Sequence, residues 1–271
     1  MQTGSPVLYR PEAGARPRID RAEMLRYLGY AGQTIEPDLA RRIELVAEQT
    51  ERDIAPRGVW QVFDLDADGA DDRGLPCIRL AGTAARLTGR DIFRHLRAAR
   101  RCAVLACTLG MESERRLRTL AGQSPLESAL FDAACSAYVE AAVDRMDAEV
   151  GRAAAEAGLA RNRRFSCGYG DCPIEAQDGI VAALNAGRLL GLTVTPTHLL
   201  LPTKSVTALI GLFEGEPADA GERPGCGGCR LRGSCAFRAR GTVCYGCPLP
   251  SRRRPAGALQ SGTEPVRKVS R

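Results

Sequence analysis

Lysine and histidine are nearly missing from this chain of 271 residues. Its 38 basic residues include only two lysines, Lys204 and Lys268, and its two histidines, His95 and His198, lie far apart in the sequence. We therefore do not expect a Ser–His or Cys–His catalytic triad, which needs a histidine beside the nucleophile. The chain also has neither a P-loop nor a dinucleotide-binding fingerprint.

Long hydrophobic runs are absent as well. No apolar stretch approaches the ~18–20 residues that a membrane-spanning helix requires. The N-terminal residues lack the apolar region of a secretory signal, so we expect a cytoplasmic protein with no membrane partner. With 44% hydrophobic and 26% charged residues, the composition is that of a globular protein and excludes a collagenous or wholly disordered chain.

Positive charge and cysteine are concentrated at the C-terminal end. Residues 223–271 carry eleven basic residues and one acidic residue, Glu264, whereas the whole chain has a net charge of only +6. Five of the 11 cysteines also fall there. A mildly acidic body and a strongly basic, cysteine-rich tail are two different parts of the molecule.

Changes in composition divide the chain further. Proline, glycine and the lack of apolar periodicity predict a flexible arm over residues 1–19. Residues 20–215 form the expected globular domain, 224–248 a cysteine-rich segment, and 249–271 a disordered basic tail.

The globular domain mixes helix and strand signals. Capping residues and apolar spacing predict helices after Asp20, Pro37, Thr88, Ser124 and Pro173, the last over residues 174–190. Apolar runs predict strands at 59–65, 75–80, 102–108, near 165, and at 192–194, 198–201 and 206–213, with a turn after the first of these. Because strands and helices do not alternate strictly, we expect an α+β fold, mainly an antiparallel sheet with packed helices, plus a small metal-binding C-terminal segment.

The segment Arg164-Phe165-Ser166-Cys167-Gly168-Tyr169-Gly170-Asp171-Cys172-Pro173 joins a predicted strand to a predicted helix. Its glycines would let the backbone approach a ligand closely, and Arg164 could bind a carboxylate with both guanidinium nitrogens. Asp171 is placed to cap the helix that follows. Taken alone, the segment is more typical of a tight strand-to-helix turn that buries its tyrosine than of a ligand site.

A second segment completes a larger pattern. Gly191-Leu192-Thr193-Val194-Thr195 is followed by Pro202-Thr203-Lys204-Ser205-Val206-Thr207. Together with Arg164-x3-Gly168-Tyr169-x2-Cys172-Pro173, this run resembles the activation domain of cobalamin-dependent methionine synthase, and above all its short, stand-alone relatives. The match covers about 50 residues, 164–211. That family has a tyrosine in the strand after the Ser-Val pair, where this chain has Ile210.

The resemblance implies a fold and a function. Family members bind S-adenosylmethionine and lie over the cobalamin of the synthase, where they support reductive remethylation of its cobalt. Carried over by position, Arg164 would hold the carboxylate of S-adenosylmethionine. Ser166 and Gly168 would supply backbone contacts, and Tyr169 would lie near the corrin. The cobalamin itself would belong to the partner protein.

The tail carries a separate signal, two Cys-x-x-Cys pairs with a fifth cysteine between them. These residues are Cys226, Cys229, Cys235, Cys244 and Cys247. Two thiolates at this spacing can reach one metal, and four suit either tetrahedral zinc or an iron–sulfur cluster. The spacing leaves the metal open, as well as which four cysteines bind it.

Three functions follow from these patterns. The favoured one is an accessory subunit of a cobalamin-dependent methyltransferase, methionine synthase above all, with a corrinoid-binding methyltransferase subunit and an electron-donor protein as partners. The second is a stand-alone redox or methyltransferase enzyme that uses S-adenosylmethionine. The third is a zinc-binding protein whose tail contacts nucleic acid, which is disfavoured because Phe237 and Tyr245 are the tail's only aromatics.

Overall fold

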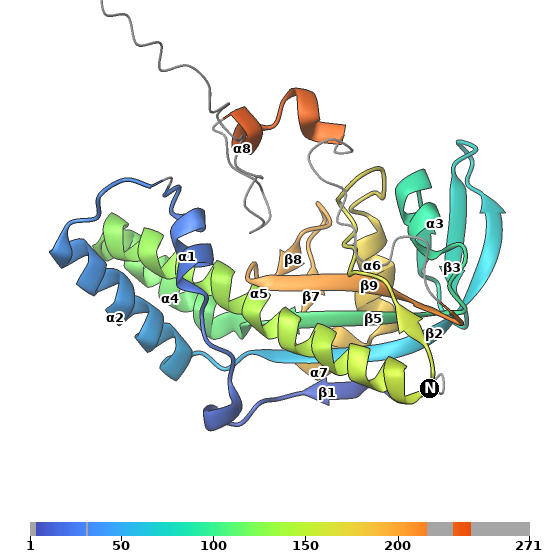
Figure 1. Ribbon diagram of the computed structural model, residues 1–271, viewed down its shortest axis with the longest axis horizontal. Coiled ribbons are helices and arrows are strands. Elements are labelled where there is room, and N and C mark those ends of the chain that lie inside the picture. Colours follow the sequence, from blue (N-terminus) through green and yellow to red (C-terminus); the bar gives the residue numbers. More distant parts are fainter. Residues whose placement is uncertain (1–3, 31, 216–229, 240–271) are drawn as a thin grey trace, which may run out of the picture. The chain divides into compact units, whose positions relative to one another are not determined.

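A computed structural model describes residues 4–30, 32–215 and 230–239 (Figure 1). The chain divides into two units, Met1–Gly225 and Cys226–Arg271. In the second unit the described residues form a 3₁₀ turn at Arg230–Gly233 and the short helix α8 at Ala236–Ala239. The sheet and the remaining helices belong to the first unit.

A seven-stranded sheet organises this unit. Its strands are β1 (Val7–Tyr9), β2 (Arg57–Ala70), β3 (Pro76–Leu80), β4 (Arg86–Thr88), β5 (Arg101–Thr108), β6 (Ala160–Arg161) and β9 (Ser205–Phe213). Their order is β4-β3-β2-β5-β9-β6, with β1 pairing beside β2, and every pairing is antiparallel. A separate hairpin joins β7 (Thr193–Val194) to β8 (Leu200–Leu201).

Strand β5 is the centre of the sheet and is buried on both faces. It pairs with β2 on one side and β9 on the other. Ala103, Leu105 and Cys107 face one hydrophobic cluster, and Cys102, Val104 and Ala106 face another. A strand covered on both sides needs apolar residues at every position, which explains the unbroken run from Cys102 to Cys107.

Helices cover the two faces unequally. The first face carries α1 (Arg21–Tyr27), α2 (Pro37–Asp53), α4 (Gly110–Gln123) and α5 (Pro125–Glu156). The other carries α3 (Arg90–Leu96), α6 (Ala176–Ala183) and α7 (Ala186–Leu190). Helix α5 runs across the first face (Figure 1), and its buried alanines, Ala133, Ala134, Ala137 and Ala142 among them, let it approach the sheet and α2 closely.

The expected α+β fold with a mainly antiparallel sheet is confirmed. Asp20 accepts hydrogen bonds from the backbone of α1, and Ser124 from that of α5, as their capping patterns predict. Other predictions need correction. The helix over 174–190 is broken into α6 and α7 because Asn185 adopts a left-handed conformation, with φ of 49°. Strand β2 continues to Ala70, through the residues expected to form a turn.

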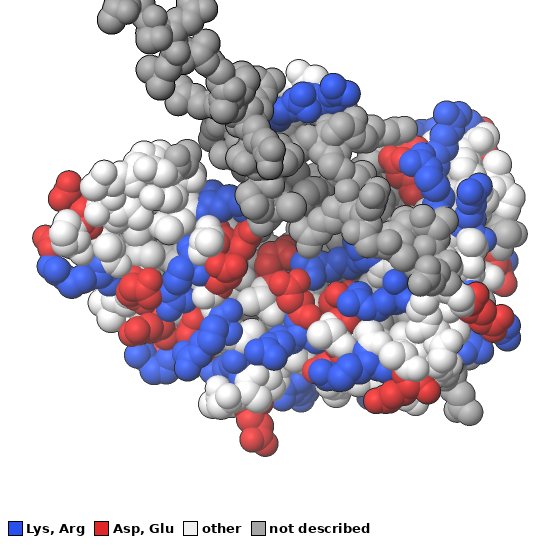
Figure 2. All heavy atoms as spheres, in the orientation of Figure 1, with Lys and Arg blue, Asp and Glu red and all other residues white. Residues whose placement is uncertain are grey.

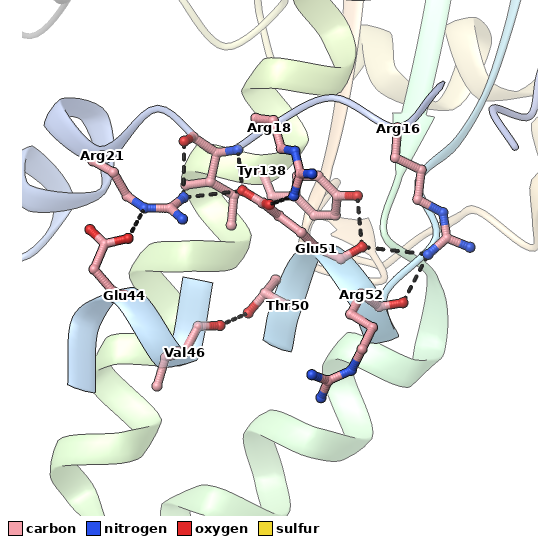
Figure 3. A network of polar contacts seen from close by, with 10 residues as sticks. Arg16, Arg18, Arg21, Glu44, Val46, Thr50, Glu51, Arg52 and Tyr138 are labelled. Atoms are coloured by element: carbon pink, nitrogen blue, oxygen red, sulfur yellow. Dashed lines mark hydrogen bonds and ion pairs between the residues drawn. The ribbon is translucent and has the colours of Figure 1, made fainter. Parts of the chain in front are cut away.

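The N-terminal residues differ from the expected flexible arm. Residues 7–9 form strand β1, and a 3₁₀ turn follows at Ala13–Ala15. The segment after it is fixed to α2 by Glu51, whose side chain is only 5% exposed (Figure 3). Glu51 accepts hydrogen bonds from Arg18 at 2.6 Å, the backbone N–H of Ile19 at 2.8 Å and Arg21 at 3.1 Å.

Within the described part of the chain, no helix combines the length and the apolar character that crossing a membrane would demand. Lys, Arg, Asp and Glu side chains are interspersed over the described surface in Figure 2.

Candidate functional site

The segment 162–166 lies along the edge of the sheet beside β9. Phe165 and Leu209 exchange two backbone hydrogen bonds, of 2.9 and 2.8 Å. Asn162 accepts from the N–H of Gly211 through its side chain, and the hydroxyl of Ser166 donates to the carbonyl oxygen of Thr207 at 2.7 Å. The sheet therefore holds the residues on either side of Arg164 in place.

Arg164 points toward helix α5, where two carboxylates meet it. Its guanidinium is 2.9 Å from Glu140 and also bonds Asp144. Burial disfavours the charged guanidinium, but the two carboxylates outweigh this effect and raise the pKa of Arg164. Burial also raises the pKa of Glu140 above its usual range, although Arg164 counteracts part of that shift. The cluster is thus one cation between two anions at a partly exposed position.

Residues 166–172 form the tight turn that the sequence suggested. The N–H of Gly168 donates to the carbonyl oxygen of Cys172 at 3.0 Å, and that of Tyr169 to Ser166 at 3.3 Å. Gly168 has φ of 92°, a conformation that side-chain-bearing residues rarely adopt. Tyr169 is 61% exposed, so the alternative in which this turn buries its tyrosine is wrong.

Asp171 caps a helix other than the expected one. Its carboxylate accepts from the backbone N–H groups of Arg90 at 2.9 Å and Asp91 at 2.8 Å, at the start of α3. The sequence assigned this cap to Thr88, but the N-cap residue is Gly89, which has no side chain to accept a hydrogen bond. A Cβ atom on Gly89 would lie 2.6 Å from the carbonyl oxygen of Asp171, so the close approach itself requires glycine there.

The second motif connects β9 to the helices of the first face. Lys204 lies 2.7 Å from Asp132 and donates to Ser136 at 2.8 Å, both on α5. Thr203 donates to Glu114 of α4 at 2.8 Å. These contacts hold the start of β9 against α4 and α5.

Ile210 lies in the protein interior. Its side chain is fully buried in the cluster beneath α5. Ile210 comes directly after Leu209, which pairs with Phe165. The position at which the resembled family has a tyrosine therefore offers no exposed surface in this chain.

Most of the predicted metal site lies outside the described residues. Of its five cysteines the structure describes only Cys235, which is a half-buried free thiol. The other four lie outside the described residues: Cys226, Cys229, Cys244 and Cys247. Within residues 4–30, 32–215 and 230–239, no group of three or more histidine, cysteine or acidic side chains is arranged to hold a metal ion.

The sequence interpretation missed Glu140 and Asp144. Their spacing of four residues places both on one side of helix α5, next to a helix surface that is otherwise rich in buried alanine. That spacing was a visible signal of an acidic stripe. Its pairing with Arg164 depends on how α5 lies on the sheet.

Among solved structures, the chain is similar to one titled "Crystal Structure of the MetH Reactivation Domain bound to AdoHcy". The two share 13% sequence identity with a TM-score of 0.57, over 81% of this chain and 80% of that one. Neither the protein-family models nor the curated proteins give a match. The likeness establishes a related fold.

Proposed function

We propose that this chain is an accessory subunit of a cobalamin-dependent methyltransferase, methionine synthase in the first instance, and that it binds an S-adenosyl ligand at Arg164 and the Gly168–Tyr169 turn. The observation that carries the proposal is the fold shared with a reactivation domain that holds AdoHcy. AdoHcy is what remains of S-adenosylmethionine once its methyl group has been transferred. Arg164, Gly168 and Tyr169 stand in the segment that carries the family pattern, at the sheet edge.

The charges around Arg164 support this assignment. The amino-acid end of an S-adenosyl ligand carries a carboxylate and an ammonium group. Arg164 supplies a cation, and Glu140 and Asp144 supply anions within a few ångströms of it. The carboxylate of the ligand would replace either Glu140 or Asp144 as a hydrogen-bond partner of Arg164. The ammonium group of the ligand would then pair with the displaced carboxylate of the protein.

The role of the protein would be to position the ligand. In the proposed reaction, the partner's corrinoid would supply the cobalt that accepts the methyl group once an electron-donor protein has reduced it. S-adenosylmethionine held by this chain would give up that methyl group from its sulfonium sulfur and remain as S-adenosylhomocysteine. Tyr169 is exposed at the tip of the turn and would meet the corrin-bearing partner.

Calorimetric titration with S-adenosylhomocysteine tests the binding step. Arg164→Lys keeps the positive charge but cannot form a bidentate pair with a carboxylate, so we expect the affinity for S-adenosylhomocysteine to fall about tenfold or more. Arg188→Lys, at an exposed position on α7, is the matched control and should bind as the unchanged chain does. Equal affinity for all three proteins, or no binding at all, would refute the site.

A reactivation assay tests the accessory role. Methionine synthase that lacks its own reactivation domain and holds cobalt(II) would be mixed with this chain, S-adenosylmethionine and a reducing agent. We expect the cobalt(II) absorption to convert to that of methylcobalamin, more slowly with Arg164→Lys. If S-adenosylhomocysteine binds but no conversion occurs, a stand-alone enzyme becomes the better interpretation.

The tail remains a prediction of its own. Zinc or an iron–sulfur cluster at Cys226, Cys229, Cys235, Cys244 and Cys247 would be distinguished by iron, sulfide and zinc analysis of anaerobically purified protein. A cluster would add an electron-transfer role to the proposed subunit, whereas one zinc would make the tail structural.

A further inference from the structure

Two cysteine thiols lie in contact at the base of the Gly168–Asp171 turn. The Sγ atoms of Cys167 and Cys172 are 2.9 Å apart, whereas a disulfide bond is ~2.05 Å long. Both side chains are buried, at 5% and 2% exposure. A small inward movement of either sulfur would bring the pair to bonding distance.

The backbone around the pair already has the form of a closed ring. The hydrogen bond from Gly168 to the carbonyl oxygen of Cys172 joins the two ends of the turn, and Cys172 donates in turn to Tyr169 at 3.2 Å. The two cysteines are therefore held face to face by the turn itself.

Among the residues that the structure describes, no metal site accounts for the pair. Two thiolates alone leave a zinc ion or a cluster short of ligands. In the described part of the chain, no third histidine, cysteine or acidic side chain joins them in a group that could hold a metal.

We propose that Cys167 and Cys172 are a reversible dithiol–disulfide pair whose oxidation closes a covalent ring around Gly168, Tyr169, Gly170 and Asp171. The oxidant is a low-molecular-weight disulfide. This inference goes beyond the proposed function and does not depend on S-adenosyl binding.

The reaction balances as ordinary thiol–disulfide exchange. The thiolate of Cys167 attacks one sulfur of the small disulfide, whose S–S bond breaks and releases one thiol. Cys172 then gives up its proton and attacks the sulfur of Cys167 in the mixed disulfide, which releases the second thiol. Two protein thiols are oxidised, and one small disulfide is reduced to two thiols.

The geometry also assigns the order of attack. Cys172 donates its S–H to Cys167, and this hydrogen bond together with burial raises the pKa of Cys172. Cys172 therefore holds its proton, and the slightly more exposed Cys167 reacts first.

Oxidation would restrict the backbone of two residues whose positions the turn determines. The ring contains Tyr169, the exposed residue at its tip, and Asp171, which caps α3. Closing the ring removes freedom from the turn without requiring a new fold.

The chain provides its own control pair. Cys102 and Cys107 are separated by five positions, as Cys167 and Cys172 are, and both are fully buried. They face opposite sides of β5 and belong to different clusters, so they cannot bond to each other in the folded protein. Trypsin places Cys167 and Cys172 together in peptide 165–188, and Cys102 and Cys107 together in peptide 102–115, with no further cysteine in either.

The test is mass spectrometry of the full chain treated with oxidised glutathione, alkylated and then digested. We expect peptide 165–188 to lose the mass of two hydrogen atoms and to escape alkylation, and dithiothreitol to reverse both effects. Peptide 102–115 should be alkylated only after unfolding. If peptide 165–188 keeps two free thiols, or if both peptides oxidise together, the proposal is wrong.

Two variants separate ring closure from nonspecific oxidation. Cys172→Ser should stop at the mixed disulfide, so that peptide 165–188 gains one glutathione at Cys167. Cys167→Ser should leave Cys172 unmodified. Hydrogen exchange of the amides at 168–172 should slow on oxidation of the unchanged chain and not in either variant. Unchanged exchange on oxidation, or a disulfide from Cys167 or Cys172 to any other cysteine, would overturn the assignment.

Discussion

Replacing Asp171 by alanine should loosen helix α3, although 81 residues separate Asp171 from the backbone N–H that it holds. The carboxylate receives two backbone N–H groups, at 2.9 and 2.8 Å, which otherwise have no partner within a helix. Gly89, the N-cap residue, has no side chain to substitute for it.

The magnitude follows from the cap. Losing an N-cap side chain costs about 1 kcal/mol, and hydrogen bonds to a charged acceptor are at the strong end, so we expect a loss of about 1.5 kcal/mol. For a unit of this size that corresponds to a fall in Tm of about 3–6 °C. The loss includes contacts of Ile92 and Leu96, which α3 buries in the sheet's second cluster.

Thermal unfolding of three proteins checks this reasoning. The N–H of Arg90 bonds one carboxylate oxygen of Asp171 and the N–H of Asp91 bonds the other. Asp171→Asn keeps only one of these acceptors and replaces the other with an NH2 group, so this variant should lose about half of what alanine loses. Asp171→Ala should show the full loss. If alanine costs nothing, or if asparagine costs as much as alanine, then the hydrogen bonds to α3 are not what Asp171 contributes.

Two further changes test the packing on either face of the sheet. Glu51→Gln should cost about 2 kcal/mol at pH 7 in a urea titration, since it weakens three hydrogen bonds to a buried carboxylate, whereas Glu44→Gln on the exposed part of the same helix should cost under about 0.5. Burial would raise the pKa of Glu51, but the hydrogen-bond donors around the carboxylate outweigh burial and lower that pKa. The stabilisation by Glu51 should therefore persist above about pH 4.3 and disappear as the pH falls further. Glu51→Gln should not show this pH dependence. Gly179→Ala should destabilise by about 1–3 kcal/mol in the same titration because a Cβ atom there would lie 2.8 Å from the Cα of Ala85, while Gly122→Ala, with open space around it, should stabilise by about 0.5.

Sequence reasoning succeeded where the determining interactions are local. Asp20 and Ser124 cap helices that begin at the next residue, so short-range patterns identify them. The run Cys102–Thr108 is apolar at every position, which is the pattern of a strand covered on both sides.

It failed where a residue serves a distant partner. Asp171 stands just before Pro173 and looks like the cap of the helix that follows, but the fold brings α3 to it. The sequence suggested that Arg164 is available to bind a ligand carboxylate, yet in the structure it already binds Glu140 and Asp144. No pattern within a few residues contains either pairing, because each depends on how helices lie on the sheet.

Short paired elements were lost for a different reason. Strand β1 has only three residues, too few for alternation to be recognised, and it forms because β2 offers it an edge. The polar half of β2 carries aspartates that favour a turn, yet pairing with β3 keeps it extended at Asp66 and Ala67.

The position of Ile210 limits how the proposed ligand could be recognised. Isoleucine has neither a ring on which an S-adenosyl group could stack nor a hydroxyl that could bond it. The side chain of Ile210 is also fully buried beneath α5 and is out of a ligand's reach. Recognition would then have to come from the charged cluster at Arg164 and from the backbone of the turn at Gly168. Charge pairing and backbone contacts fix the amino-acid end of a ligand better than its aromatic end. A protein built this way would distinguish S-adenosyl compounds by their zwitterionic end first, and the corrinoid-bearing partner that we propose would have to enclose the rest.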